Sequence, residues 1–264
     1  MPDRAVRVAI LAAMPQEMRD LRDDLVVDPS AALAADPARG SREFLAGRLW
    51  GVPVVLAWTR WGKVAAAVTA THVLATYAPD AVIFTGVAGS LDPAVGIGDV
   101  VVADSLVQHD MDATPLFARH EIPLLGASEL AADATIHAGL LRAAEQFIGE
   151  DLSGSVPSTA RSAFGIRDPR VHAGQIATGD RFVNDAAAGA DIRLRLPRAL
   201  CVEMEGAAVA QVCHEHAVPC GVVRVISDRA DDDAGTDFAS FLQHVASAYT
   251  HGILRRYLAD AVRG

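Results

Sequence analysis

Residues 199–228 read ALCVEMEGAAVAQVCHEHAVPCGVVRVISD, and this stretch decides the fold class. Its apolar runs at 199–202 and 221–227 have the length of buried strands. The segment 205–216 between them fits a helix of about three turns. A strand, a helix and a second strand in this order belong to an alternation that implies a largely parallel sheet with helices on both faces.

The same alternation extends along the chain. Further apolar runs predict strands at residues 6–13, 43–49, 52–59, 81–85, 99–106 and 174–178. Apolar spacing and alanine content predict helices from Met18 to Leu25 and at residues 64–77, 130–148 and 238–262. Residues 86–89 are expected to form a glycine turn, and 27–41 and 151–170 to be mobile loops. We therefore expect an α/β protein with a single three-layer αβα domain over residues 1–264. Its central twisted sheet should be mixed but largely parallel.

Composition excludes several classes of protein. A chain of 264 residues with 51% hydrophobic and 21% charged residues is too apolar to be disordered. A net charge of -10 argues against nucleic acid as a partner. No apolar run approaches the roughly 18 residues of a membrane span, and the run Val6–Met14 is too short to be read as a signal. Three cysteines outside any metal-binding spacing predict reduced thiols in a cytoplasmic protein.

Ligands of such sheets bind beyond the carboxyl ends of the strands, so polar residues that follow apolar runs are the candidates. Glu17 follows the first strand, although its position alone favours a simple complement to a helix dipole. The glycine turn, with Val87, Ala88 and Gly89, is equally consistent with a tight turn and with a ligand loop. Of Glu203 and Glu205, only one should face a pocket if the helix has begun, and we prefer Glu205.

The last predicted strand carries a second group of candidates. Arg224 interrupts its β-branched run and needs a strong acceptor if it is buried. Asp228 shares a face with Arg224 by alternation, whereas Ser227 points the other way unless the strand has ended. Phe182 follows another strand and is consistent with a ring that covers a flat ligand, although an ordinary core phenylalanine is the commoner case. Residues 109–112, His-Asp-Met-Asp, have no second histidine at ligand spacing, so a metal site is not expected.

Eight segments together resemble the nucleoside phosphorylase/nucleosidase superfamily, and most closely its 5′-methylthioadenosine/S-adenosylhomocysteine nucleosidases. The resemblance runs from Val8 to about Leu258. It rests on AAMPQEM (12–18), GKVAAA (62–67), TGVAG (85–89), GDVVV (98–102), HDMDAT (109–114), TGDRFVN (178–184), VEMEGAAVA (202–210) and RVISDRAD (224–231). It implies hydrolysis of an N-glycosidic bond that releases adenine and a thioribose, with no metal and no cofactor.

The resemblance also implies roles for single residues. Asp228 would protonate adenine N7, with Ser227 orienting it. Glu17 would activate the attacking water, and Arg224 would help to position that carboxylate. The implied substrate-binding residues are Glu205 and Met204 at the ribose, Phe182 and the Val183 backbone at adenine, and Val202, Val87, Ala88 and Gly89 around them. The helix start should keep Glu17 ionised, whereas Asp228 needs a raised pKa to donate a proton.

Two positions depart from the family, and three other functions stay open. Val87 stands where the family often has a hydroxyl, and Trp61 replaces a smaller residue. The alternatives are a purine nucleoside phosphorylase, another purine nucleosidase such as a futalosine hydrolase, and a non-catalytic nucleoside-binding protein. A homodimer is expected, because the apolar segment around Leu116, Phe117 and Pro123 suits an interface. In the family this region reaches the partner subunit's pocket.

Overall fold

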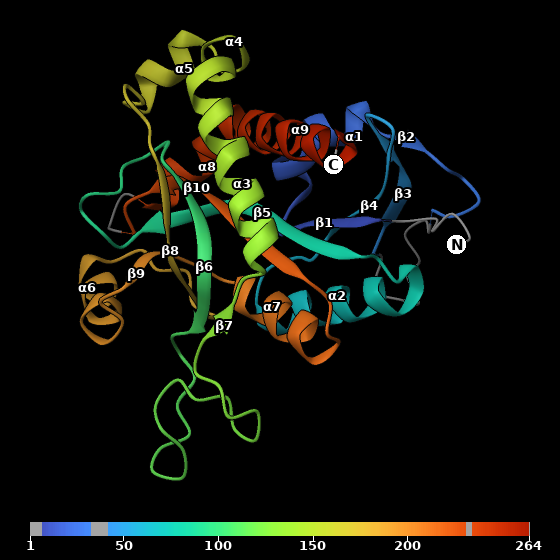
Figure 1. The fold of residues 1–264 in the computed structure, drawn as a ribbon. Coiled ribbons are helices and arrows are strands. Elements are labelled where there is room, and N and C mark those ends of the chain that lie inside the picture. The colour runs from blue at the N-terminus through green and yellow to red at the C-terminus, as the bar shows by residue number, and fades with distance from the viewer. Residues whose placement is uncertain (1–6, 33–41, 231–233, 264) are drawn as a thin grey trace.

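The computed structural model of the chain describes residues 7–32, 42–230 and 234–263, and a single mixed sheet runs through its centre (Figure 1). The strands are β1 (Val8–Ala12), β2 (Val26–Val27), β3 (Phe44–Leu49), β4 (Val52–Trp58), β5 (Ala81–Ser90), β6 (Val100–Gln108), β7 (Leu130–Ala131), β8 (Val171–Thr178), β9 (Ala199–Glu203) and β10 (Cys220–Asp228). The predicted strands are confirmed within a few residues at their ends.

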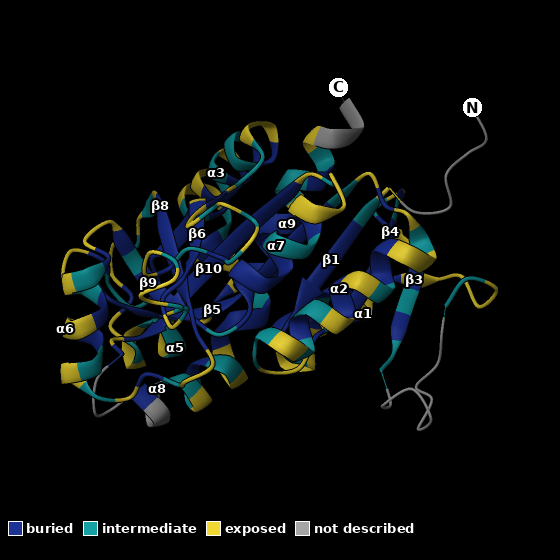
Figure 2. Cartoon of the chain, turned by 90° about the horizontal axis from the view of Figure 1, so that it is seen from below, coloured by how far each residue is buried: buried dark blue, intermediate teal, exposed yellow. Residues whose placement is uncertain are grey.

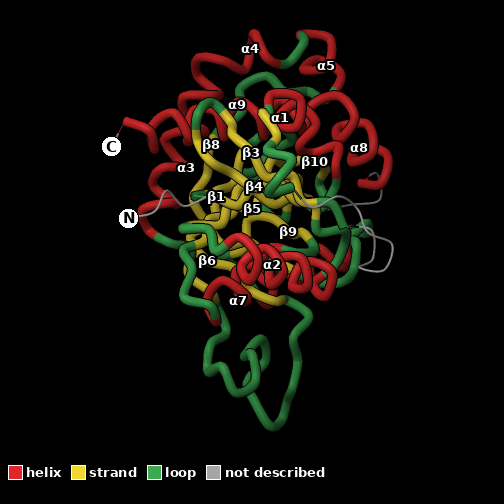
Figure 3. The backbone as a smooth tube through the Cα atoms, turned by 90° about the vertical axis from the view of Figure 1, so that its right-hand side faces the viewer, coloured by secondary structure: helices red, strands yellow, loops and turns green. Residues whose placement is uncertain are grey.

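Helices lie on both faces of this sheet (Figure 3). One face carries η1 (Pro15–Met18, a 3-10 helix), α1 (Arg19–Asp24), α3 (Ala134–Gln146), the π-helical turns η3 (Phe147–Asp151) and η4 (Leu242–Ala246), α8 (Ala234–Phe241) and α9 (Ser247–Arg263). The other face carries α2 (Lys63–Tyr77) and α7 (Gly206–Glu215). The three-layer αβα arrangement is therefore confirmed. Within the described ranges, no helix combines the length and the apolar content needed to cross a bilayer.

Strand alternation sends apolar side chains into both layers. In β1, Ala9 and Leu11 join the core beneath α2 and α7, whereas Ile10 and Ala12 join the core beneath α3 and α9. Figure 2 shows the result, with buried strands in the interior and exposed residues on the outer faces of the helices. Because both faces of the sheet are covered, polar side chains can reach a ligand only near the strand ends.

Part of the sheet closes on itself. β5 is parallel to β1 and β10, but its last residues pair antiparallel with β9, as Gly89 opposite Val202 shows. From β9 the pairing continues through β8 and β6 and returns to β10. The five strands β5, β9, β8, β6 and β10 thus form a ring, which brings the end of β9 next to the ends of β5 and β10.

Three local predictions are wrong. Residues 86–89 are not a turn, because they continue β5 to Ser90. Leu130–Ala131 forms β7 instead of opening α3, which begins at Ala134. The segment 151–170 contains α4 (Leu152–Ser155) and α5 (Ser158–Ala163), and its Val156 and Ile166 are buried in the core. Of the predicted loop 27–41, residues 33–41 lie outside the described residues.

A longer helix than α4 and α5 also escaped prediction. α6 (Ala186–Arg195) covers the ring of strands, and its start is capped by the Asp185 carboxylate, which accepts the Ala188 N–H at 2.7 Å. Aspartate is a favoured residue at that position. The helix is weakly amphipathic, with Gly189 and Ile192 as its buried residues, so periodicity gave little sign of it.

Candidate active site

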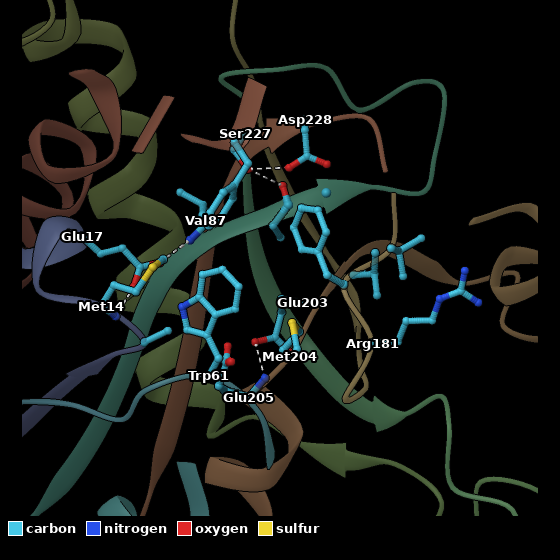
Figure 4. Close-up of a pocket in the computed structure, with 17 residues that line it drawn as sticks. Met14, Glu17, Trp61, Val87, Arg181, Glu203, Met204, Glu205, Ser227 and Asp228 are labelled. Atoms are coloured by element: carbon cyan, nitrogen blue, oxygen red, sulfur yellow. Dashed lines mark hydrogen bonds between the residues drawn. The ribbon is translucent and has the colours of Figure 1, made fainter. Parts of the chain in front are cut away.

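A cavity opens at the edge of the sheet where β5, β9 and β10 end, and Figure 4 shows the side chains around it. It encloses about 540 Å³, including its open mouth. It is lined by Ala13, Met14, Glu17, Trp61, Val87, Ala88, Gly89, Arg181, Phe182, Val183, Val202, Glu203, Met204, Glu205, Ser227, Asp228 and Phe238. Every predicted site residue except Arg224 is among them.

Glu17 enters the cavity from η1, directly after β1. One carboxylate oxygen accepts the Met14 N–H at 2.8 Å, and the other accepts the Val87 N–H at 3.1 Å. Burial raises the pKa of Glu17, although Arg224 and these N–H groups act against the rise. The helix start was expected to favour the ionised carboxylate, and the net effect of the surroundings is instead a pKa above the ordinary value. Val87 thus contacts Glu17 through its backbone, for which no hydroxyl side chain is needed.

Gly86 allows Glu17 and Arg224 to approach the same point of β5. A Cβ atom on Gly86 would lie 2.5 Å from the Glu17 Oε1 atom and 3.1 Å from the Arg224 Nη1 atom. A Cβ atom does not tolerate the first of these distances, so any residue other than glycine would displace the Glu17 carboxylate. This close approach, and not a turn, is the reason for a glycine at position 86.

Arg224 lies beneath the cavity floor, and its direct carboxylate partner is Glu203. Its Nη2 atom donates to Glu203 Oε2 at 2.6 Å, and its guanidinium stacks 4.1 Å from the centre of the Phe84 ring. Burial by itself would lower the pKa of Arg224. The negative charge of Glu203 outweighs burial and raises that pKa. Arg224 acts on Glu17 through its charge, and its ion pair is with Glu203, so the expected role of Arg224 in positioning Glu17 stays a prediction.

Glu203 is a site residue that the sequence analysis set aside. Besides Arg224, its carboxylate accepts the Thr178 hydroxyl and the Gly206 N–H, the latter at 2.9 and 2.8 Å to its two oxygens. The expectation that only one glutamate faces the cavity is wrong, because it assumed helical geometry. Glu203 ends β9, and α7 begins only at Gly206, so the bend between them directs both Glu203 and Glu205 inward.

Glu205 is held by a segment far away in sequence. Its Oε1 atom accepts the Gly62 N–H at 2.7 Å, just before α2 begins. Burial and the neighbouring Glu203 charge raise the pKa of Glu205 to about 8. At neutral pH its carboxyl group therefore retains a proton in a large fraction of the molecules. Such a group can both donate a hydrogen bond to a hydroxyl and accept one from it.

A β-bulge places Ser227 and Asp228 on the same side. In the pairing of β10 with β5, Ile226 lies opposite Ala88 and Asp228 opposite Gly89, so Ser227 is the extra residue. Its hydroxyl donates to Asp228 Oδ2 at 2.8 Å, while Asp228 Oδ1 accepts the Ala230 N–H at 2.9 Å. Strict alternation would have separated the two side chains. The bulge explains why both line the cavity, with the Asp228 carboxyl held at both oxygens.

Aromatic side chains flank the mouth of the cavity. Phe182 and Trp61 each contact Phe238 edge to face, with ring centres 5.6 and 5.8 Å apart. Val183 is buried beside Phe182, whereas Trp61 remains half exposed. The three rings come from separate parts of the chain, and Phe238 belongs to α8, for which the sequence offered no site signal.

The segment 109–112 connects neighbouring parts of the fold through the side chain of Asp110. Lys63 reaches Asp110, with 2.6 Å between Nζ and Oδ1, and Asp110 also accepts the Asp180 N–H at 2.9 Å. These bonds tie the start of α2 to the segments that follow β6 and β8. Among the described residues, no three His, Cys, Asp or Glu side chains form a group that could hold a metal ion.

Comparison with known proteins agrees with this geometry. A sequence profile described as "Phosphorylase superfamily" matches residues 7–259. The 5′-methylthioadenosine/S-adenosylhomocysteine nucleosidase of Anoxybacillus flavithermus is 37% identical over 242 residues, which cover 91% of this chain and 93% of that protein.

Two solved structures superpose closely on this fold. The Neisseria meningitidis 5′-methylthioadenosine/S-adenosylhomocysteine nucleosidase, in complex with methylthio-immucillin-A, has a TM-score of 0.82 and 32% identity, covering 96% of this chain and 99% of its own. The futalosine hydrolase of Helicobacter pylori has a TM-score of 0.80 and 28% identity, covering 97% and 98%. The resemblance inferred from the eight segments is therefore confirmed, and the chain belongs to the phosphorylase superfamily and, within it, to the family of 5′-methylthioadenosine/S-adenosylhomocysteine nucleosidases.

Proposed function

We propose that this protein hydrolyses the N-glycosidic bond of 5′-methylthioadenosine and S-adenosylhomocysteine, releasing adenine and the thioribose. The observation that carries the proposal is the pair Glu17 and Asp228, two buried carboxyl groups that enter one cavity from different sides. Glycoside hydrolysis needs such a pair, one group to protonate the leaving group and one to activate water.

Asp228 is the general acid of the proposed reaction. Its Oδ2 atom is oriented by the Ser227 hydroxyl and its Oδ1 atom by the Ala230 N–H. The proton passes from Asp228 to N7 of adenine as the bond between ribose C1′ and adenine N9 breaks. Protonation makes adenine a better leaving group while positive charge develops on the ribose.

Glu17 is the general base. Its two oxygens are held by the N–H groups of Met14 and Val87, which fixes the carboxylate toward the cavity. Water bound to Glu17 attacks C1′ and loses a proton to the carboxylate as the new C–O bond forms. The raised pKa of Glu17 makes it a better proton acceptor than an exposed glutamate.

The remaining residues bind the nucleoside. Glu205 hydrogen-bonds the ribose hydroxyls, and Met204 packs against the sugar. Phe182 covers the adenine ring, and the backbone at Val183 is positioned for its polar edge. Arg224, held by Glu203, stabilises the negative charge on Glu17 through space.

Base release tests the proposal directly. The protein is incubated with 5′-methylthioadenosine, S-adenosylhomocysteine, inosine and futalosine, with and without millimolar phosphate, and the free bases are separated by chromatography. We expect adenine from the first two nucleosides at a rate that phosphate does not change. A phosphate-dependent rate with a sugar-1-phosphate product would contradict hydrolysis and indicate the phosphorylase.

The cavity itself disfavours a phosphorylase. Phosphate sites are rich in arginine. The described residues that line this cavity include four acidic residues, Glu17, Glu203, Glu205 and Asp228, and one arginine, Arg181, which pairs with Asp185 at 2.6 Å. Because the fold also superposes on a futalosine hydrolase, futalosine is included in the assay. Bound adenine without any turnover would instead support a nucleoside-binding protein.

We further propose that two copies of the chain associate. The loop between β6 and β7 projects away from the body on the side of α2 and α7 (Figures 1 and 3). Leu116 and Leu124 on this loop are 85% and 96% exposed, and Val64 on α2 is 75% exposed. Exposed apolar side chains on one side of a molecule are typical of an interface.

The three cysteines are buried and unpaired, which supports the proposal of a cytoplasmic location.

A further inference from the structure

A second hollow adjoins the nucleoside cavity on its open side. Its lining includes Met14, Trp61 and Phe238, which also line the cavity, so the two spaces meet at these side chains. Beyond them it is bordered by Pro15, Gln16, Arg19, Arg22, Ala239, Leu242 and Gln243. We call this hollow the outer groove. It runs between α1 on one side and α8 and η4 on the other.

The charges of the two spaces are opposite. Four acidic residues line the nucleoside cavity, whereas the charged residues among the described lining of the outer groove are Arg19 and Arg22. These arginines are three residues apart on α1 and therefore share one face of the helix. The outer groove therefore offers an anion two cationic partners, whereas carboxyl groups predominate over the one arginine, Arg181, in the described lining of the cavity.

Both guanidinium groups have donors to spare. Arg19 uses its Nε atom for Asp20, at 3.0 Å from Oδ1. Arg22 stacks 5.7 Å from the centre of the Trp58 ring. Among the described residues its nearest carboxylate is Glu43, which is 3.9 Å away and thus beyond a hydrogen bond. The side chains are 57% and 53% exposed. Each guanidinium carries five N–H donors, so each can still bind a carboxylate.

We propose that the outer groove binds a carboxylate at the end of the 5′ substituent of the nucleoside. This inference rests on the proposed function, because it places the ribose in the adjoining cavity. The path leads from the apolar side chains Met14, Trp61 and Phe238 to the two arginines. It matches a 5′ arm that begins with a thioether or methylene stem and ends in an anion. A methylthio group would reach only the apolar part.

Kinetics with matched substrates test this proposal. We compare kcat/KM for S-adenosylhomocysteine, whose arm ends in a carboxylate, with that for 5′-methylthioadenosine, whose arm is neutral and short. The test protein carries Arg19→Gln and Arg22→Gln together. The control carries Arg48→Gln and Arg142→Gln, which remove the same two charges from β3 and α3. The kcat/KM for S-adenosylhomocysteine, divided by that for 5′-methylthioadenosine, should fall about three- to tenfold in the test protein and stay unchanged in the control.

A second measurement does not depend on variants. The methyl ester of S-adenosylhomocysteine keeps the length of the arm but lacks the negative charge. The wild type should turn it over with a kcat/KM about three- to tenfold lower than for the acid, whereas the double variant should not distinguish the two. The proposal is overturned if the wild type has the same kcat/KM for the acid and the ester. It is also overturned if the kcat/KM ratio of S-adenosylhomocysteine to 5′-methylthioadenosine in the double variant stays within twofold of the wild-type ratio.

Two further outcomes separate the possible sources of the carboxylate and the two proposals. Futalosine also carries a carboxylate at the end of its 5′ arm, and its cleavage is followed as hypoxanthine instead of adenine. If the double variant loses hypoxanthine release from futalosine but keeps adenine release from S-adenosylhomocysteine, the groove binds the arm of futalosine. If the wild type releases no base from any nucleoside, the proposed hydrolysis is wrong. The groove is then tested by calorimetry, where the double variant should lose affinity for S-adenosylhomocysteine but not for 5′-methylthioadenosine.

Discussion

At the scale of single residues, Asp228 and Glu17 have the same functional group and opposite proposed tasks. Asp228→Asn keeps the shape but cannot supply an acidic proton, and Glu17→Gln cannot accept one. Each change should lower kcat on the order of 10²–10⁴-fold, with little effect on KM, because other residues contact the nucleoside. Steady-state kinetics at saturating 5′-methylthioadenosine measure this.

The matched control for both is Asp191→Asn, which removes an exposed carboxylate that pairs with Arg195 on α6. It should leave kcat within twofold of the wild type. A KM that rises steeply while kcat holds would show that Asp228 and Glu17 bind the substrate without taking part in proton transfer.

Glu205 should make the stability of the free protein depend on pH. Its pKa of about 8 in the folded protein lies above the ordinary 4.5, so the folded state binds this proton more tightly than the unfolded state. The contribution is therefore fully present below pH 4.5 and is lost as the pH rises to 8. Glu205→Gln removes it. Between pH 5.5 and 7.5 the free energy of unfolding in urea should fall more for the wild type than for the variant, by up to about 1.4 kcal/mol per pH unit. Parallel pH profiles would contradict the raised pKa.

At the scale of elements, the buried pair of Glu203 and Arg224 ties the end of β9 to the middle of β10. Glu203→Gln leaves a buried guanidinium without a compensating charge, which typically costs about 3–5 kcal/mol. The control, Glu129→Gln, breaks an exposed pair with Arg198 at 3.1 Å and should cost less than about 1 kcal/mol. Urea unfolding of both variants measures the difference. Equal losses would show that the buried pair contributes no more than a surface one.

The end of β5 leaves room for the proposed general acid, Asp228, because Gly89 has no side chain. A Cβ atom on Gly89 would lie 2.7 Å from Asp228 Oδ1 and 3.1 Å from the Ala230 Cβ, so Gly89→Ala must displace the Asp228 carboxyl group. A displacement near 1 Å lowers catalysis on the order of 100-fold, and we expect a loss of kcat of that order. At Gly96 a Cβ atom would meet no atom within 4 Å, so Gly96→Ala serves as the control. A Gly89→Ala protein with wild-type kcat would show that the acid tolerates displacement.

At the scale of the whole molecule, the projecting loop and α2 predict a dimer. Light scattering at micromolar concentration should give about 55 kDa, twice the chain mass of 27.7 kDa. Leu124→Glu places a charge on the loop where an apolar contact is expected, and it should shift the mass toward the single chain. The control is Leu194→Glu on α6, which is also exposed but lies away from the loop. A wild type that stays monomeric would contradict the prediction.

The sequence by itself determined the αβα arrangement and eleven of the seventeen residues that line the candidate site. Buried strands are continuous apolar runs that alternate with helices, so local patterns were sufficient for the layers of the fold. The roles of the site residues came instead from the resemblance of the eight segments to the family. Asp228 and Glu17 were noticed because each follows an apolar run, but the catalytic role of Glu17 was implied only by the resemblance to the family. The glycines of β5 were predicted to form a turn, whereas they continue the strand and make room for neighbouring side chains. A glycine that accommodates a neighbour and one that forms a turn look alike in a sequence.

Only the tertiary structure decided which groups act together. The bulge in β10 turns Ser227 toward Asp228, and a change of register between two strands leaves no mark in local periodicity. The ring of strands carries Glu203 to Arg224, a partner 21 positions away, because the end of β9 meets β5 and β10. Met14, Trp61 and Phe238 border both the cavity and the outer groove although they lie far apart along the chain. Contacts of this kind depend on how whole elements pack, and local sequence does not encode that packing in any short pattern.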